Sequence, residues 1–223
     1  MIVVLDEVEG RVLGCLIEKS LTTPELYPLT LNALANACNQ KSSREPVMSL
    51  EHGLVERGVN SLVEKGYAAR RYEPGGRAAK YGHRAEVLLG TEDAQIIGVI
   101  CTLLLRGAQT LGEIKTRSER LCAFPSITEV EILLGQLAGR VDGPIVERLP
   151  RQPGQKETRW RQLFTQEAGA PAAVPPPVDP LPPAPSTAAP PVAFQQAEER
   201  LALLERRVAA LEDAVEKLAK SRT

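Results

Sequence analysis

Two short stretches of the chain gather basic side chains around a Pro-Gly turn, which is a pattern suited to binding phosphate groups. Residues 74–81 read PGGRAAKY and residues 153–160 read PGQKETRW, so the order of turn, bases and aromatic residue is repeated. Residues 70–84 and residues 148–161 each hold five bases and one acid, a net charge of +4. Such hairpins can lie along the backbone of duplex DNA. Their bases are Arg70, Arg71, Arg77, Lys80, Arg84, Arg148, Arg151, Lys156, Arg159 and Arg161.

Four more candidate DNA-binding residues lie just before or within the third helix expected in the chain. Lys41 and Arg44 precede this helix, and Arg57 and Asn60 within it offer donors to base edges. The same helix carries several glutamates, and an acidic helix reads a DNA groove poorly because phosphates flank the groove. We therefore expect the hairpins to make most of the DNA contacts, and the helices to make few contacts with base edges. Basic residues also protect exposed edge strands, so a protein partner stays an alternative.

Catalytic and metal-binding patterns are missing from the sequence. It contains no P-loop, no dinucleotide-binding glycine motif, no nucleophile elbow and no metal-ligand spacing. The two histidines, His52 and His83, show no nucleophile to pair with, and we expect His83 on the hairpin surface. The four cysteines fit reduced core residues of a cytoplasmic protein, with no cofactor. They are Cys15, Cys38, Cys101 and Cys122.

The elements that carry the first hairpin follow a helix-helix-helix-hairpin order. Apolar residues at helical spacing predict a helix from about Leu5, and Thr30 predicts the N-cap of a second one. Ser49 is the expected N-cap of the third helix, and Gly66 ends it. Strands are expected at 67–72 and 78–84.

The same order returns in the second half of the chain. Thr91, Thr110 and Ser126 are the expected caps of three helices, the last two as capping boxes. Strands are expected at 145–149 and 157–163. A duplicated order with a duplicated turn predicts a mostly α fold with small β-hairpins, built of two tandem winged-helix domains at residues 1–90 and 91–167.

Several longer stretches also resemble the YceH-like family of bacterial proteins. The resemblance spans about residues 5–165, implies a tandem winged-helix fold, and assigns no functional residue to this chain. The stretches that carry it are residues 12–19 (VLGCLIEK), 27–34 (YPLTLNAL), 37–42 (ACNQKS), 80–84 (KYGHR), 105–107 (LRG) and 149–151 (LPR).

A linker and a heptad pattern follow the two domains. Residues 168–193 are rich in proline and alanine and are expected to form an extended spacer. Residues 194–223 place valine or leucine at a and leucine at d, which favours a parallel dimeric coiled coil over a helix packed on its own domain. The core positions are Leu201, Leu204, Val208, Leu211, Val215 and Leu218.

The total charge limits how this chain can bind a polyanion. The 223 residues have a net charge of −1, so electrostatic binding depends on the two local patches. No stretch is long and apolar enough to span a membrane. We expect a dimeric DNA-binding protein without enzymatic activity, with transcriptional regulation as its candidate role. The alternative is an interaction scaffold whose winged helices hold a protein partner.

Overall fold

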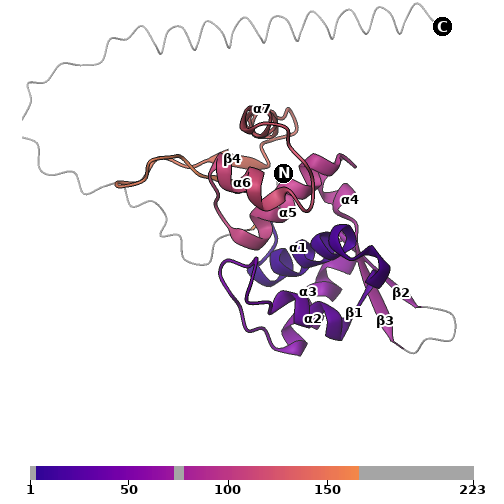
Figure 1. The fold of residues 1–223 in the computed structure, drawn as a ribbon. Coiled ribbons are helices and arrows are strands. Elements are labelled where there is room, and N and C mark those ends of the chain that lie inside the picture. Colours follow the sequence, from indigo (N-terminus) through magenta and orange to yellow (C-terminus); the bar gives the residue numbers. More distant parts are fainter. Residues whose placement is uncertain (1–3, 73–77, 166–223) are drawn as a thin grey trace, which may run out of the picture. The chain divides into compact units, whose positions relative to one another are not determined.

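The computed structural model describes residues 4–72 and 78–165, and all of them lie in one compact unit. The fold is mixed α+β, with helices around small antiparallel sheets (Figure 1). Among the described residues, no helix is long and apolar enough to cross a membrane. Arg77, the linker and all six heptad core positions lie outside the described residues.

The first repeat, residues 4–90, joins a helical layer to a three-stranded sheet. The sheet order is β1-β3-β2, with Leu29 opposite Tyr81 and Arg71 opposite Lys80. The short strand β1 comes between the first two helices and was not expected from the sequence. The elements are α1 (Glu7–Thr22), the 3-10 helix η1 (Pro24–Leu26), β1 (Leu29–Thr30), α2 (Leu31–Cys38), α3 (His52–Glu64), β2 (Ala68–Tyr72), β3 (Ala79–His83) and α4 (Ala85–Leu89).

The second repeat, residues 91–165, follows the same order with a smaller sheet. Strands β4 and β5 pair with each other, and an isolated bridge joins Gln109 to Trp160 at the place that β1 has in the first repeat. The elements are α5 (Ala94–Arg106), α6 (Leu111–Ser118), α7 (Ile127–Ala138), β4 (Val146–Arg148) and β5 (Trp160–Gln162). The observed elements thus repeat the order expected from the sequence.

Helix α1 is the centre of the unit because it packs on elements of both repeats. It begins with a capping box between Asp6 and Glu9 and is buried from Glu9 to Ile17. Helices α3 and α5 lie against it. Its glycines allow the close approach of α5: a Cβ on Gly14 would lie 2.8 Å from Leu105 Cδ2. The two repeats therefore share one continuous core, and the expected boundary at residues 90–91 falls between α4 and α5.

Local capping was predicted correctly at three helices and wrongly at two. Thr30 caps α2, Thr110 caps α6 with the expected capping box, and Ser126 caps α7 through a single bond from the Glu129 amide rather than a full box. Helix α3, however, begins after Glu51 rather than Ser49, and α5 is capped by Asp93 rather than Thr91. The Asp93 carboxylate accepts hydrogen bonds from two backbone amides of the first turn, which one hydroxyl does not match.

Candidate nucleic-acid interface

The first hairpin holds its basic residues on two faces of the strand pair. Arg71 lies opposite Lys80, while Arg70 lies opposite Tyr81, on the other face. The Arg70 guanidinium is 5.7 Å from the centre of the Tyr81 ring and donates a hydrogen bond to Asn60 of α3. Arg70 and Asn60 are thus fixed against each other, which limits the reach of Asn60 to a base edge.

The remaining first-repeat candidates differ in exposure. Arg71, Arg84, Lys41 and Arg57 are exposed, and Lys80 is half-buried. Arg84 lies 3.9 Å from the carboxylate of Glu86. These positions leave an exposed basic face on the hairpin, with Arg57 of α3 as a further exposed cation.

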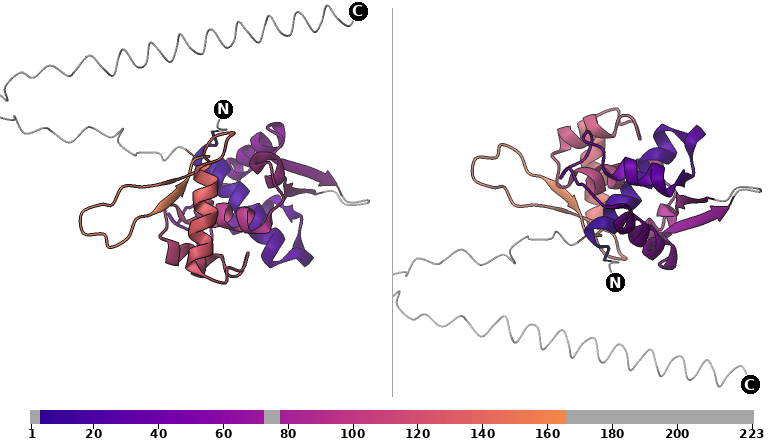
Figure 2. Two further views of the ribbon diagram at one scale, coloured as in Figure 1. Left: turned by 90° about the horizontal axis from the view of Figure 1, so that it is seen from above. Right: turned by 90° about the horizontal axis from the view of Figure 1, so that it is seen from below.

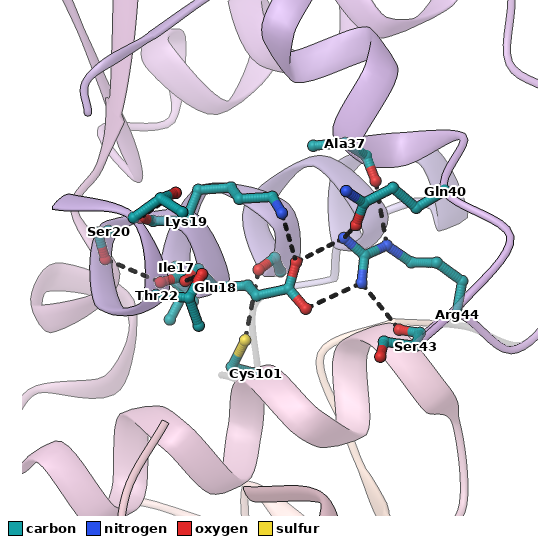
Figure 3. A network of polar contacts seen from close by, with 12 residues as sticks. Ile17, Glu18, Lys19, Ser20, Thr22, Ala37, Gln40, Ser43, Arg44 and Cys101 are labelled. Carbon is teal, nitrogen blue, oxygen red and sulfur yellow. Dashed lines mark hydrogen bonds and ion pairs between the residues drawn. The ribbon is translucent and has the colours of Figure 1, made fainter. Parts of the chain in front are cut away.

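Arg44 has a different place from the one expected. Its side chain is fully buried and points into the protein, where both terminal nitrogens bind Glu18 of α1, at 3.1 Å and 2.6 Å (Figure 3). Gln40 and the carbonyl groups of Ala37 and Ser43 accept its other hydrogen bonds. Its assignment as a DNA-binding residue is therefore wrong, because a nucleic acid cannot reach a guanidinium that the core encloses.

The second hairpin loses part of its expected charge to ion pairs. Arg159 Nη1 lies 2.9 Å from a carboxylate oxygen of Glu113, at the start of α6, and Arg161 pairs with Glu147 across the strands. The Arg161–Glu147 pair could have been predicted from the sequence, since Glu147 and Arg161 are nearly equidistant from the Pro-Gly turn.

Three cations of the second hairpin stay exposed beside a cavity of about 490 Å³. Arg148, Arg151 and Lys156 line it together with one acid, Glu157, and the first residues of α6 and α7 form its other side. Arg148 donates a hydrogen bond of 2.9 Å to the Thr158 hydroxyl. The opening can admit a phosphate group of a nucleic acid backbone between the hairpin and the two helices.

The two hairpins extend from opposite sides of the unit (Figure 2). The second hairpin, in orange, lies on one side and the β2–β3 hairpin on the other in both views. One chain therefore presents two separate basic surfaces rather than one continuous patch.

His83 is not the surface residue that the sequence indicated. Its side chain is 18% exposed, and its Nε2 atom lies 2.9 Å from the Ser20 hydroxyl of α1. Burial lowers the pKa of His83, and Tyr27 packs nearby. All four cysteines are buried and unpaired, which confirms their expected place in the core.

The comparisons with known proteins match most of the chain to one family. A family described as "Protein of unknown function, DUF480" matches residues 5–155. The chain belongs to this family. The resemblance to YceH-like proteins fits the same family in broad terms.

Three relatives show how far the similarity extends. The chain is 47% identical to UPF0502 protein VC_A0740 of Vibrio cholerae, over 73% of this chain and 77% of that protein. It is 50% identical to UPF0502 protein GSU0233 of Geobacter sulfurreducens, over 75% of each chain. It is 42% identical to UPF0502 protein VPA1223 of Vibrio parahaemolyticus, over 98% of this chain and 99% of that protein.

Proposed function

We propose that this protein is a non-enzymatic tandem winged-helix protein that binds duplex DNA through its basic hairpins. The observation that carries the proposal is the pair of exposed cationic surfaces, each on a hairpin that follows three helices. The sheet order β1-β3-β2 is the order of a winged-helix domain, and the Gln109–Trp160 bridge supports the same arrangement in the second repeat.

The salt dependence of binding tests this proposal. Each hairpin has about three exposed cations, and about three phosphate contacts give a log–log slope of affinity against salt near −3. Two hairpins on one DNA, as in a dimer, give about six contacts and a slope near −5. We expect fluorescence anisotropy of a labelled duplex with the full chain to give a slope in this range.

Matched variants separate hairpin contacts from general charge. Arg71→Ala and Arg151→Ala each remove one exposed hairpin cation, and we expect each to weaken binding at low salt and to reduce the slope by about 1. Lys115→Ala, which removes a half-buried cation of α6 that belongs to neither hairpin and lies 3.9 Å from Glu119, is the control and is expected to keep the wild-type slope. A slope near zero for the wild type, or an equal loss in the control, contradicts DNA binding by the hairpins.

Self-association through residues 194–223 belongs to the same proposal and rests on the heptad pattern alone. A parallel coiled coil would bring two chains, and so twice the hairpin cations, to one DNA. Sedimentation of the full chain is expected to show a dimer, and Leu204→Asp with Leu211→Asp is expected to give a monomer. A wild-type monomer at micromolar concentration contradicts the dimer.

The alternative is a protein-binding scaffold, and one observation favours it. Helix α7 carries no basic residue and exposes Ile127 and Ile132, at 49% and 54%, next to two exposed glutamates. An apolar and acidic helix face suits a protein partner better than a DNA groove. A stoichiometric partner that Ile132→Asp releases, with no DNA retained by the wild type, would support this alternative.

A further inference from the structure

A second polar cavity lies at the junction of the two repeats, apart from both hairpins. It has a volume of about 220 Å³ and is bordered by α1, the connection between α2 and α3, α5 and α6. Its lining is mostly polar and includes the hydroxyl groups of Ser42 and Ser43. Every element that faces it ends or turns there, so the cavity is built from parts of the chain that are far apart in sequence.

Four basic side chains line this cavity, which we call the junction cavity. They are Lys19, Arg106, Arg117 and Arg120. The only acid in its lining is Glu18, and the buried guanidinium of Arg44 already holds both of its carboxylate oxygens. Figure 3 shows this pair, with Lys19 reaching toward the same carboxylate at 3.7 Å. Glu18 is thus shared, because it pairs with Arg44 and Lys19 and also raises the pKa of Arg106.

The arginines of the junction cavity differ in whether their guanidinium groups have hydrogen-bond or ion-pair partners in the protein. Arg117 has partners, since it lies 3.5 Å from Glu113 and 3.9 Å from Glu45 and binds Gln109. Within the described part of the chain, the guanidinium groups of Arg106 and Arg120 make no hydrogen bond or ion pair. Burial lowers the pKa of Arg106 and the nearby charge of Arg117 lowers it further, while the carboxylates of Glu18 and Glu45 partly offset this lowering. Arg106 and Arg120 thus face one cavity with hydrogen-bond donors that no described protein group accepts.

A position at a helix end explains why each cation is there, but it does not explain why these cations all line the same cavity. Lys19, Arg106 and Arg117 lie in the last turns of three helices, where a positive charge stabilises the helix by about 0.3–1 kcal/mol. That benefit is the same wherever the helix end points. Directing three helix ends and Arg120 into one small cavity adds repulsion between like charges, which an anion would relieve.

We propose that the junction cavity binds a small ligand through one or two phosphate groups. Guanidinium groups match phosphate oxygens in pairs of hydrogen bonds, and hydroxyl donors complete such sites. Several cations favour a multiply charged phosphate over a single carboxylate. The volume is below the range of about 300–1,000 Å³ that is usual for drug-sized ligands, so the cavity fits a phosphate end rather than a whole nucleotide. The ligand would contact both repeats at once.

The test is titration calorimetry of the full chain with inorganic pyrophosphate, at an ionic strength kept constant with sodium chloride. We expect saturable binding of one pyrophosphate per chain. Arg106→Gln and Arg120→Gln should each weaken it about tenfold or more, because each removes a charge-assisted contact. Arg140→Gln, an identical change at a half-buried position just after α7, should leave it unchanged. Equal melting temperatures without ligand show that the variants are folded.

A second arm separates a free phosphate ligand from the phosphates of DNA. The affinity of Arg106→Gln for a short duplex is measured beside that of Arg151→Gln in the second hairpin. An unchanged duplex affinity together with weakened pyrophosphate binding supports the proposal, whether or not the hairpins bind DNA. The proposal is overturned if the wild type shows no saturable binding, if Arg140→Gln loses as much as Arg106→Gln, or if Arg106→Gln weakens only duplex binding.

Discussion

Replacing Arg44 by methionine should destabilise the fold strongly, although the sequence groups this arginine with exposed DNA ligands. Its side chain is 0% exposed and donates hydrogen bonds to Glu18, Gln40 and two backbone carbonyl groups. Methionine fills much of the same volume but provides no donor. The substitution therefore leaves the largely buried Glu18 carboxylate without its main partner, with Lys19 at 3.7 Å as its remaining cation.

The expected loss follows from what remains behind. Removing one partner of a buried ion pair costs about 3–5 kcal/mol, mainly because the other charge stays buried. The Glu18 side chain is 14% exposed, so some hydration remains, and we expect the lower end, about 3 kcal/mol. For a chain of this size each kcal/mol lowers the melting temperature by about 2–4 °C, so the expected drop is about 6–12 °C.

Urea unfolding followed by circular dichroism measures this loss, and Lys41→Met is the matched control. Lys41 is on the same connection but is exposed, so its replacement should change stability by less than about 0.5 kcal/mol. The double variant Glu18→Leu with Arg44→Met should recover much of the loss, because both charges are then gone. Below its melting temperature, Arg44→Met should keep the wild-type affinity for duplex DNA. The buried role of Arg44 would be refuted if Arg44→Met lowered the free energy of unfolding by less than about 1 kcal/mol, or if it weakened DNA binding as much as Lys41→Met does.

Three further predictions concern acid stability, helix packing and thiol reactivity. Burial alone would raise the pKa of Glu9 and Glu113, but hydrogen bonds and nearby cations outweigh it and lower both. Their stabilising effect is therefore complete above the ordinary carboxyl pKa of about 4.3 and is lost as the pH falls below it. Glu9→Gln should show a smaller drop in urea midpoint between neutral and acidic pH, and an unchanged drop contradicts this. Gly98→Ala should cost about 1–3 kcal/mol, since the new Cβ would lie 2.4 Å from Cys122 Sγ, whereas Gly112→Ala, with no atom within 4 Å, should cost nothing measurable. All four cysteines should react with a thiol reagent only after urea unfolding, and fast labelling of the native chain would contradict their burial.

Much of the local structure was predictable because it depends on neighbours in the sequence. A threonine before an apolar helix finds its own backbone amides, so Thr30 and Thr110 cap α2 and α6 as expected. The Pro-Gly segments mark both hairpins for the same reason. Where two capping residues compete within a few positions, as Thr91 and Asp93 do, the sequence alone does not rank them.

Long-range contacts decided what was not predictable. Arg44 is separated from Glu18 by 26 positions, and nothing local distinguishes it from Lys41 three residues earlier. The close packing of α1 on α5 depends on Gly14 facing Leu105, which no periodicity reveals. The junction cavity has the same origin, since its cations come from separate helices that only the packing brings together.

The two repeats have diverged in the surface that each third helix presents. Helix α3 exposes polar residues, Arg57 among them, next to a hairpin that stays basic. Helix α7 exposes Ile127 and Ile132 and has no cation of its own. If both repeats bound DNA alike, selection for phosphate contact would act against exposed isoleucines on α7. We therefore expect a division of roles, in which changes at Arg57 affect DNA affinity and changes at Ile132 affect a protein contact. Equal effects of both substitutions on DNA affinity would argue instead that the repeats act alike.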